Sequence, residues 1–159
     1  MRANLCIIFP FVVGIHLHAA EPEPSGWIRG PLVEVQADNS VKEVDEYGGH
    51  IPIGQPAFQK LTIRKGREKN SWIVSGTVVS TNAGGLNQGN AIYAGYAGGF
   101  LRLVAMSNRK GEVLVSVSPI ADREGKPIAP THVYVTSDPV PAPTHKGAIM
   151  RRYVLRPTE

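Results

Sequence analysis

The chain has 159 residues, 42% of them hydrophobic and 19% charged, and a formal net charge of +4. This length suits a single domain built around one core. Cys6 is the only cysteine, and it lies in a segment that we expect to be removed. Disulfides, thiolate metal sites and a cysteine nucleophile are therefore not expected in the mature protein.

The N-terminal segment has the pattern of a cleaved signal peptide over residues 1–20. Arg2 gives a short positive start, residues 4–15 are almost entirely apolar, and cleavage is expected near Ala19 or Ala20. About a dozen apolar residues are too few for a membrane-spanning helix of about 20; the alternative is an N-terminal helix buried in the core. We therefore expect a secreted or periplasmic protein, with no integral membrane segment in the mature chain.

The remaining chain, residues 21–159, is expected to form one domain in which charge is unevenly placed. Residues 21–56 are loop-rich with one expected strand at 31–36, and they hold seven acidic and two basic residues. Residues 57–159, the main part of the domain, hold fourteen basic and six acidic residues. The basic residues are not clustered with aromatic platforms as in nucleic-acid sites, so no nucleic-acid partner is expected.

The first expected hairpin joins strands at 58–64 and 71–81 through the polar segment KGREKN. The second of these strands is apolar on both faces, which is typical of a central, covered strand. Gly76 interrupts it and indicates a bulge or a close backbone contact. The hairpin tip is expected to be solvated. Its candidate ligands for a polyanion are Arg64, Lys65 and Arg67.

The segment AGGLNQGNAIYAGYAGGF, residues 83–100, is rich in glycine and carries no charge. A phosphate-binding P-loop needs a lysine that this segment lacks. A small-residue packing helix would use the spacing of Ala91, Gly95 and Gly99, but each glycine inside a helix costs about 1 kcal/mol relative to alanine. We therefore expect a long loop that enters a strand around Ile92 or Tyr96, and loops of this length often bind ligands.

A second hairpin is expected between residues 100–107 and 112–119. Both segments alternate in hydrophobicity, and the intervening NRKG has turn chemistry. Further strands are expected at 132–137, after the turn DREGKP, and at 149–156, after a proline-rich connection.

Six or seven short strands with frequent turns predict an all-β protein. The expected fold is a single antiparallel β-sandwich, immunoglobulin-like, or a small barrel. The strand GTVVS, the long segment after it and the turn DREGKP resemble immunoglobulin-like bacterial envelope domains in general arrangement. The resemblance implies a sandwich architecture in an exported protein.

No catalytic or metal-binding motif is found in the sequence. His50, His132 and His145 do not form H-x-H or H-x-x-x-H pairs, although the last two could converge with Met150 as metal ligands. There is no G-x-S-x-G elbow, and no acids stand out as a glycosidase pair. We expect no catalytic residues, no metal and no cofactor, with a hydrolase of unrecognised site as the remaining alternative.

Aromatic side chains are the strongest functional feature that is left. Tyr93 and Tyr96 are flanked by glycines, and with Trp27 they are interpreted as partner-binding residues because large rings serve interfaces well. The expected function is an exported, non-catalytic binding or accessory module of a bacterial-type envelope that engages a protein partner. The alternative is a carbohydrate- or polyanion-binding domain that uses the basic residues of 57–159.

Overall fold

The computed structural model describes residues 28, 30–45, 55–80, 89–137 and 146–158. These residues form antiparallel strands and turns with no helix, so the expected all-β fold, a β-sandwich or small barrel, is confirmed. In this part of the chain no helix is long and apolar enough to cross a membrane. The expected signal peptide, with Cys6, and the candidate Trp27 lie outside the described residues.

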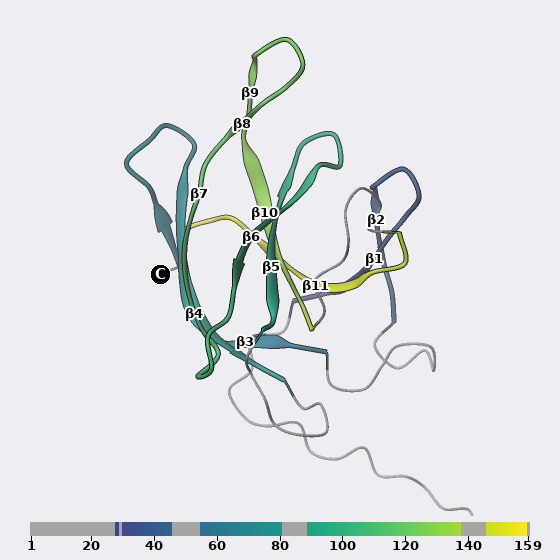
Figure 1. The fold of residues 1–159 in the computed structure, drawn as a ribbon, viewed down its shortest axis with the longest axis vertical. Coiled ribbons are helices and arrows are strands. Elements are labelled where there is room, and N and C mark those ends of the chain that lie inside the picture. Colours follow the sequence, from purple (N-terminus) through teal and green to yellow (C-terminus); the bar gives the residue numbers. More distant parts are fainter. Residues whose placement is uncertain (1–27, 29, 46–54, 81–88, 138–145, 159) are drawn as a thin grey trace, which may run out of the picture.

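The described residues contain eleven strands in three antiparallel sheets (Figure 1). One sheet has six strands in the order β2-β1-β11-β10-β5-β6, a second has the order β3-β4-β7, and β8 pairs with β9. All the expected strands are present, and the short β2, β8 and β9 are additional. In chain order the strands are β1 (Leu32–Val35), β2 (Val41–Glu43), β3 (Ala57–Lys65), β4 (Trp72–Val79), β5 (Ala91–Tyr96), β6 (Leu101–Met106), β7 (Glu112–Val117), β8 (Ile120–Ala121), β9 (Pro127–Ile128), β10 (Pro130–Thr136) and β11 (Ile149–Val154).

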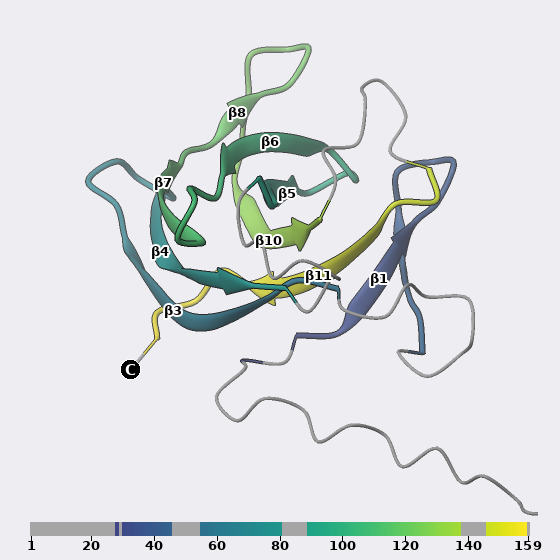
Figure 2. The same cartoon turned by 60° about the horizontal axis from the view of Figure 1, so that its bottom comes forward.

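The main core lies between the three-stranded sheet and one face of the six-stranded sheet. Successive side chains of a strand point to opposite faces, and alternate residues of β4, β5 and β10 enter this core. In Figure 2 the three-stranded sheet curves along one side of the fold. β1, which is next to the end strand β2 of the six-stranded sheet, lies on the other side. The fully or largely buried members of the main core are Phe58, Ile63, Trp72, Val74, Val78, Ile92, Ala94, Tyr96, Val113, Val117, Val133, Val135, Tyr153 and Leu155.

A second core covers the opposite face of the six-stranded sheet. Here Tyr93 of β5 and Tyr134 of β10 are cross-strand partners, and they pack with Val33 and Val35 of β1 and Met150 of β11. Residues of β1, the central strands and the start of β6 share this cluster, so the six-stranded sheet curls around it. The inner strand β5, between β10 and β6, is consequently buried on both faces along all six residues.

The β3–β4 hairpin has the expected pairing, and β4 is the central strand of its sheet. Gly76 of β4 lies opposite Leu61, next to an irregularity of β3 between Phe58 and Lys60. A Cβ on Gly76 would collide with the carbonyl oxygen of Lys60 and would lie 2.9 Å from Cδ1 of Phe58. The glycine is therefore required for a close backbone contact beside a bulge, as expected.

The second expected hairpin is wrong in its pairing, although both strands and the turn are correct. The turn is closed by the Asn108 N–H, which donates to the Glu112 carbonyl oxygen at 3.1 Å. Beyond it β6 pairs with β5 and β7 pairs with β4, so the two strands belong to different sheets. The turn is a corner at which the chain passes from one side of the main core to the other.

Replacing Gly76 by alanine tests the close contact in β4. We expect Gly76→Ala to lower the free energy of unfolding by about 1–3 kcal/mol, because the β3 backbone at Lys60 must shift, and Phe58 with it. Urea unfolding followed by circular dichroism measures this loss. Ser75→Ala on the same strand is the control and should stay within about 0.5 kcal/mol of the parent; equal effects of the two substitutions would contradict the contact.

Candidate functional site

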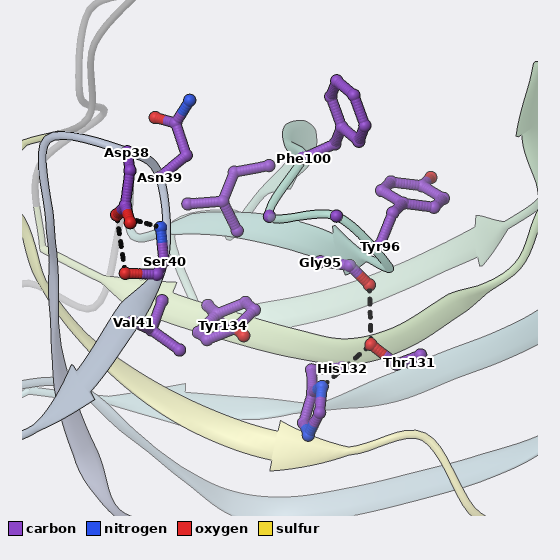
Figure 3. A pocket seen from close by; sticks show the side chains of 13 residues that line it. Asp38, Asn39, Ser40, Val41, Gly95, Tyr96, Phe100, Thr131, His132 and Tyr134 are labelled. Atoms are coloured by element: carbon purple, nitrogen blue, oxygen red, sulfur yellow. Dashed lines mark hydrogen bonds between the residues drawn. The ribbon is translucent and has the colours of Figure 1, made fainter. Parts of the chain in front are cut away.

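A hollow of about 450 Å³ opens on the second-core side of the six-stranded sheet. Two turns form its walls, the β1–β2 turn and the β5–β6 turn, and β10 forms its floor (Figure 3). The residues that line it are Asp38, Asn39, Ser40, Val41, Gly95, Tyr96, Gly98, Gly99, Phe100, Leu101, Thr131, His132 and Tyr134. We call this the concave hollow.

The first wall is a tight polar turn. Asp38 accepts hydrogen bonds from the Ser40 N–H at 3.0 Å and from the Ser40 hydroxyl at 2.6 Å, an arrangement that Asp and Ser favour in turns. These hydrogen bonds hold the pKa of the Asp38 carboxyl below its ordinary value. Asn39 has a left-handed backbone with φ of 62°, which asparagine tolerates better than most residues.

The second wall presents an aromatic ring to solvent. The β5–β6 turn is closed by the Tyr96 N–H, which donates to the Phe100 carbonyl oxygen at 2.9 Å, and Gly98 and Gly99 have φ of 82° and 81°. Glycine adopts these angles without steric cost. Phe100 stays 53% exposed. A Cβ on Gly99 would lie 3.1 Å from the Asn39 carbonyl oxygen, so the two walls meet at this point.

The floor is a layer of one aromatic and two polar side chains. The Tyr134 ring occupies the space where Gly95 has no side chain, since a Cβ there would be 2.5 Å from Cε2 of Tyr134. The Thr131 hydroxyl donates to the Gly95 carbonyl oxygen at 3.3 Å, and its oxygen lies 2.9 Å from Nδ1 of His132. In the neutral imidazole one ring nitrogen donates and the other accepts, so the floor offers both functions.

The titratable groups of the floor are neutral near neutral pH. Burial, and secondarily the charge of Arg152, lower the pKa of His132 below its ordinary value. Burial raises the pKa of Tyr134, with a smaller opposing effect of Arg152. Arg152 itself is paired with Glu43 of β2. The floor therefore presents uncharged hydrogen-bonding groups.

The structure corrects the expectation that Tyr93 and Tyr96 reach outward to a partner. Tyr93 is 1% exposed and belongs to the second core, and Tyr96 is 5% exposed and belongs to the main core. The Tyr96 hydroxyl donates to the Ser118 carbonyl oxygen at 3.1 Å. The expected strand is present as β5, which begins at Ala91, but it is covered on both faces, so its side chains are buried. Because Ala91–Tyr96 is a strand, the alternative of a small-residue packing helix through Ala91 and Gly95 is excluded.

The basic candidates lie on the three-stranded sheet and do not line the concave hollow. Arg64, Lys65 and Arg67 are exposed at the β3–β4 hairpin, as expected. The ammonium of Lys65 lies 3.7 Å from the centre of the Trp72 ring, which is a cation–π contact. The structure therefore assigns Lys65 a packing contact.

Most residues of the concave hollow were not selected from the sequence. The alternation of β10 places His132 on the face opposite Val133 and Val135, which belong to the main core. The turn segments DNS at 38–40 and AGGF at 97–100 are readable as turns. Their convergence depends on the sheet order, which no local pattern encodes.

Within the described residues, no three histidine, cysteine or carboxylate side chains come together as a metal site. His132 belongs to the floor of the concave hollow, while His50 and His145 lie outside the described residues. Comparison with protein-family models, curated proteins and solved structures finds no match to this chain. The geometry of the hollow is therefore the basis for a functional proposal.

The depressed pKa of His132 predicts a pH-dependent stability. The pKa of His132 is lower in the folded chain, so on acidification the unfolded chain takes up the histidine proton first. The stability that neutral His132 contributes is therefore fully present above the unfolded pKa and is lost as pH falls through the folded pKa. We expect urea unfolding to show lower stability at about pH 5 than at about pH 7.5, and this difference to shrink in His132→Gln. An unchanged difference in the variant would contradict the assigned burial.

Proposed function

We propose that the protein is a non-catalytic binding module whose concave hollow takes a neutral carbohydrate. The observation that carries the proposal is the combination, in one hollow of about 450 Å³, of an exposed aromatic ring, the single carboxylate of Asp38 and otherwise uncharged hydrogen-bonding groups. Volumes of a few hundred cubic ångströms are typical of small-ligand sites. Sugar rings offer one apolar face and a rim of hydroxyls, and this composition fits both.

Phe100 supports the proposal as the stacking residue. Its ring is half exposed at the mouth of the hollow and is held there by a turn whose glycines carry positive φ. Burying such a ring against an apolar ligand face removes both surfaces from water, and aromatic contacts contribute about 0.5–1.5 kcal/mol beyond this burial.

The polar groups of the hollow match the donors and acceptors of sugar hydroxyls. Asn39 offers both a donor and an acceptor, Ser40 a hydroxyl, and the floor an additional hydroxyl and imidazole. Among the described residues that line the hollow there is no lysine or arginine, which favours a neutral sugar over an anionic one. The polyanion candidates Arg64 and Arg67 lie at the β3–β4 hairpin and do not line the concave hollow.

The location of this binding is proposed from the sequence. The signal-like segment at residues 1–20 favours export, and in the envelope or outside the cell glycans are abundant ligands. A protein partner through Tyr93 and Tyr96 loses support because both rings are buried.

Titration with neutral tetrasaccharides tests the proposed function. Cellotetraose, chitotetraose and maltotetraose are added to isotope-labelled protein, and amide shifts are followed by NMR. We expect one of them to bind saturably, with shifts at residues 37–41, 95–101 and 131–134. Phe100→Ala should weaken this binding about tenfold.

Leu114→Ala is the matched control, because Leu114 is 75% exposed on β7 and does not line the concave hollow. It should bind the sugar as the parent does. Failure of all three sugars to bind would contradict the proposal, and unchanged binding by Phe100→Ala would show that the hollow is not the site.

A further inference from the structure

The two sheets each end in an edge strand on the same side of the molecule. β6 is the last strand of the six-stranded sheet and β7 the last of the three-stranded sheet, and they follow one another in the chain. No described strand pairs with the outer edge of either one. An edge strand presents backbone N–H and C=O groups that can pair with another strand.

The edges separate as they leave the 108–111 turn. Before the turn, the Ser107 N–H donates to the Asn90 carbonyl oxygen, on the side of the six-stranded sheet. After it, the Gly111 carbonyl oxygen accepts from the Val78 N–H of the three-stranded sheet, so the two segments diverge at once. Counted outward from the Asn108–Glu112 pair, a continued hairpin would place Val104 opposite Ser116. A second hollow of about 290 Å³ lies there instead.

This second hollow, with the edges that flank it, is called the seam. Its lining residues are Tyr96, Arg102, Leu103, Val104, Ser116, Ser118 and Pro119. At its base the Tyr96 hydroxyl donates to the Ser118 carbonyl oxygen, so the main core is closed below it. The seam is therefore a surface feature between two edges, and occupying it does not require the core to open.

The side chains around the seam are apolar and basic. Leu103 and Met106 of β6 and Leu114 of β7 are large exposed hydrophobic residues. Arg102 lines the seam, and its charge reaches the Tyr96 hydroxyl, where it opposes the rise that burial causes in the tyrosine pKa. The turn adds Arg109 and Lys110, while Glu112 accepts a hydrogen bond from the Asn108 side-chain amide at 2.8 Å.

We infer that the seam binds an extended, acidic segment of a protein partner, whose main chain adds a strand to the edges of β6 and β7. The two edges present backbone N–H and C=O groups toward the space between them. An extended polypeptide has alternating donors and acceptors on both sides, so it can pair with both edges. Arg102 selects a carboxylate in that segment, and the exposed leucines contact its alternate apolar side chains.

This surface is separate from the walls of the concave hollow, apart from the shared buried Tyr96. It gives a protein-binding module a place to engage its partner that does not depend on outward-facing tyrosines. The inference does not rest on the proposed carbohydrate function, and either can fail without the other.

The test uses a capped peptide of about eight residues, long enough for a typical strand, with alternating valine and threonine and one central glutamate. It is titrated into the isotope-labelled full chain and followed by amide NMR. We expect saturable shifts over both 101–106 and 112–117. A peptide with lysine in place of the glutamate should bind about tenfold more weakly, and one with N-methylated amides along one edge should not bind.

Arg102→Glu should reverse the preference between the glutamate and lysine peptides, and Arg102→Gln should remove it. Arg64→Glu, the same charge change at the β3–β4 hairpin, is the control and should keep the parent's preference. The inference is overturned by amide shifts confined to one of the two strands, or by shifts at residues 38–40. It is also overturned if the N-methylated peptide binds equally well, or if the glutamate peptide does not saturate the protein at a peptide concentration of about 1 mM, a weak limit for specific recognition.

Discussion

The rest of the structure depends on the burial of β5 on both of its faces. Ile92, Ala94 and Tyr96 enter the main core, while Ala91 and Tyr93 enter the second core. A strand with two covered faces requires one layer on each side. The three-stranded sheet supplies one layer. On the other face Tyr93 packs in one cluster with Val33 and Val35 of β1, toward the far end of the six-stranded sheet.

Both proposed binding surfaces follow from this arrangement. The curl around Tyr93 and Tyr134 brings the β1–β2 turn against the β5–β6 turn, which are about sixty residues apart, and so forms the concave hollow. The three-stranded sheet on the other side leaves β7 beside β6 without pairing them, and so forms the seam. Tyr96 lines both features because it ends the strand that separates the two cores.

Local sequence patterns predicted the strands and the turns well. The β3–β4 hairpin was predicted because alternating hydrophobicity and a polar turn agree, and Gly76 correctly marked a close contact. The same pattern does not predict the pairing of β6 and β7, because a tight turn also serves as a corner between sheets. Tyr93 and Tyr96 were misjudged because glycines beside them have a packing role: Gly95 makes room for the Tyr134 ring. The concave hollow needed the sheet order, which single-strand periodicity does not encode.

Unfolding of a Tyr93→Ala variant tests most directly whether β5 is the doubly covered centre of the fold. Tyr93 is 1% exposed, so removing its ring leaves a cavity in the second core. Large-to-small changes of buried aromatic residues lower the free energy of unfolding by about 3–5 kcal/mol, and a loss of this size in urea unfolding is the expected result. A loss below about 1 kcal/mol, the range of surface substitutions, would mean that the ring faces outward and would contradict the account.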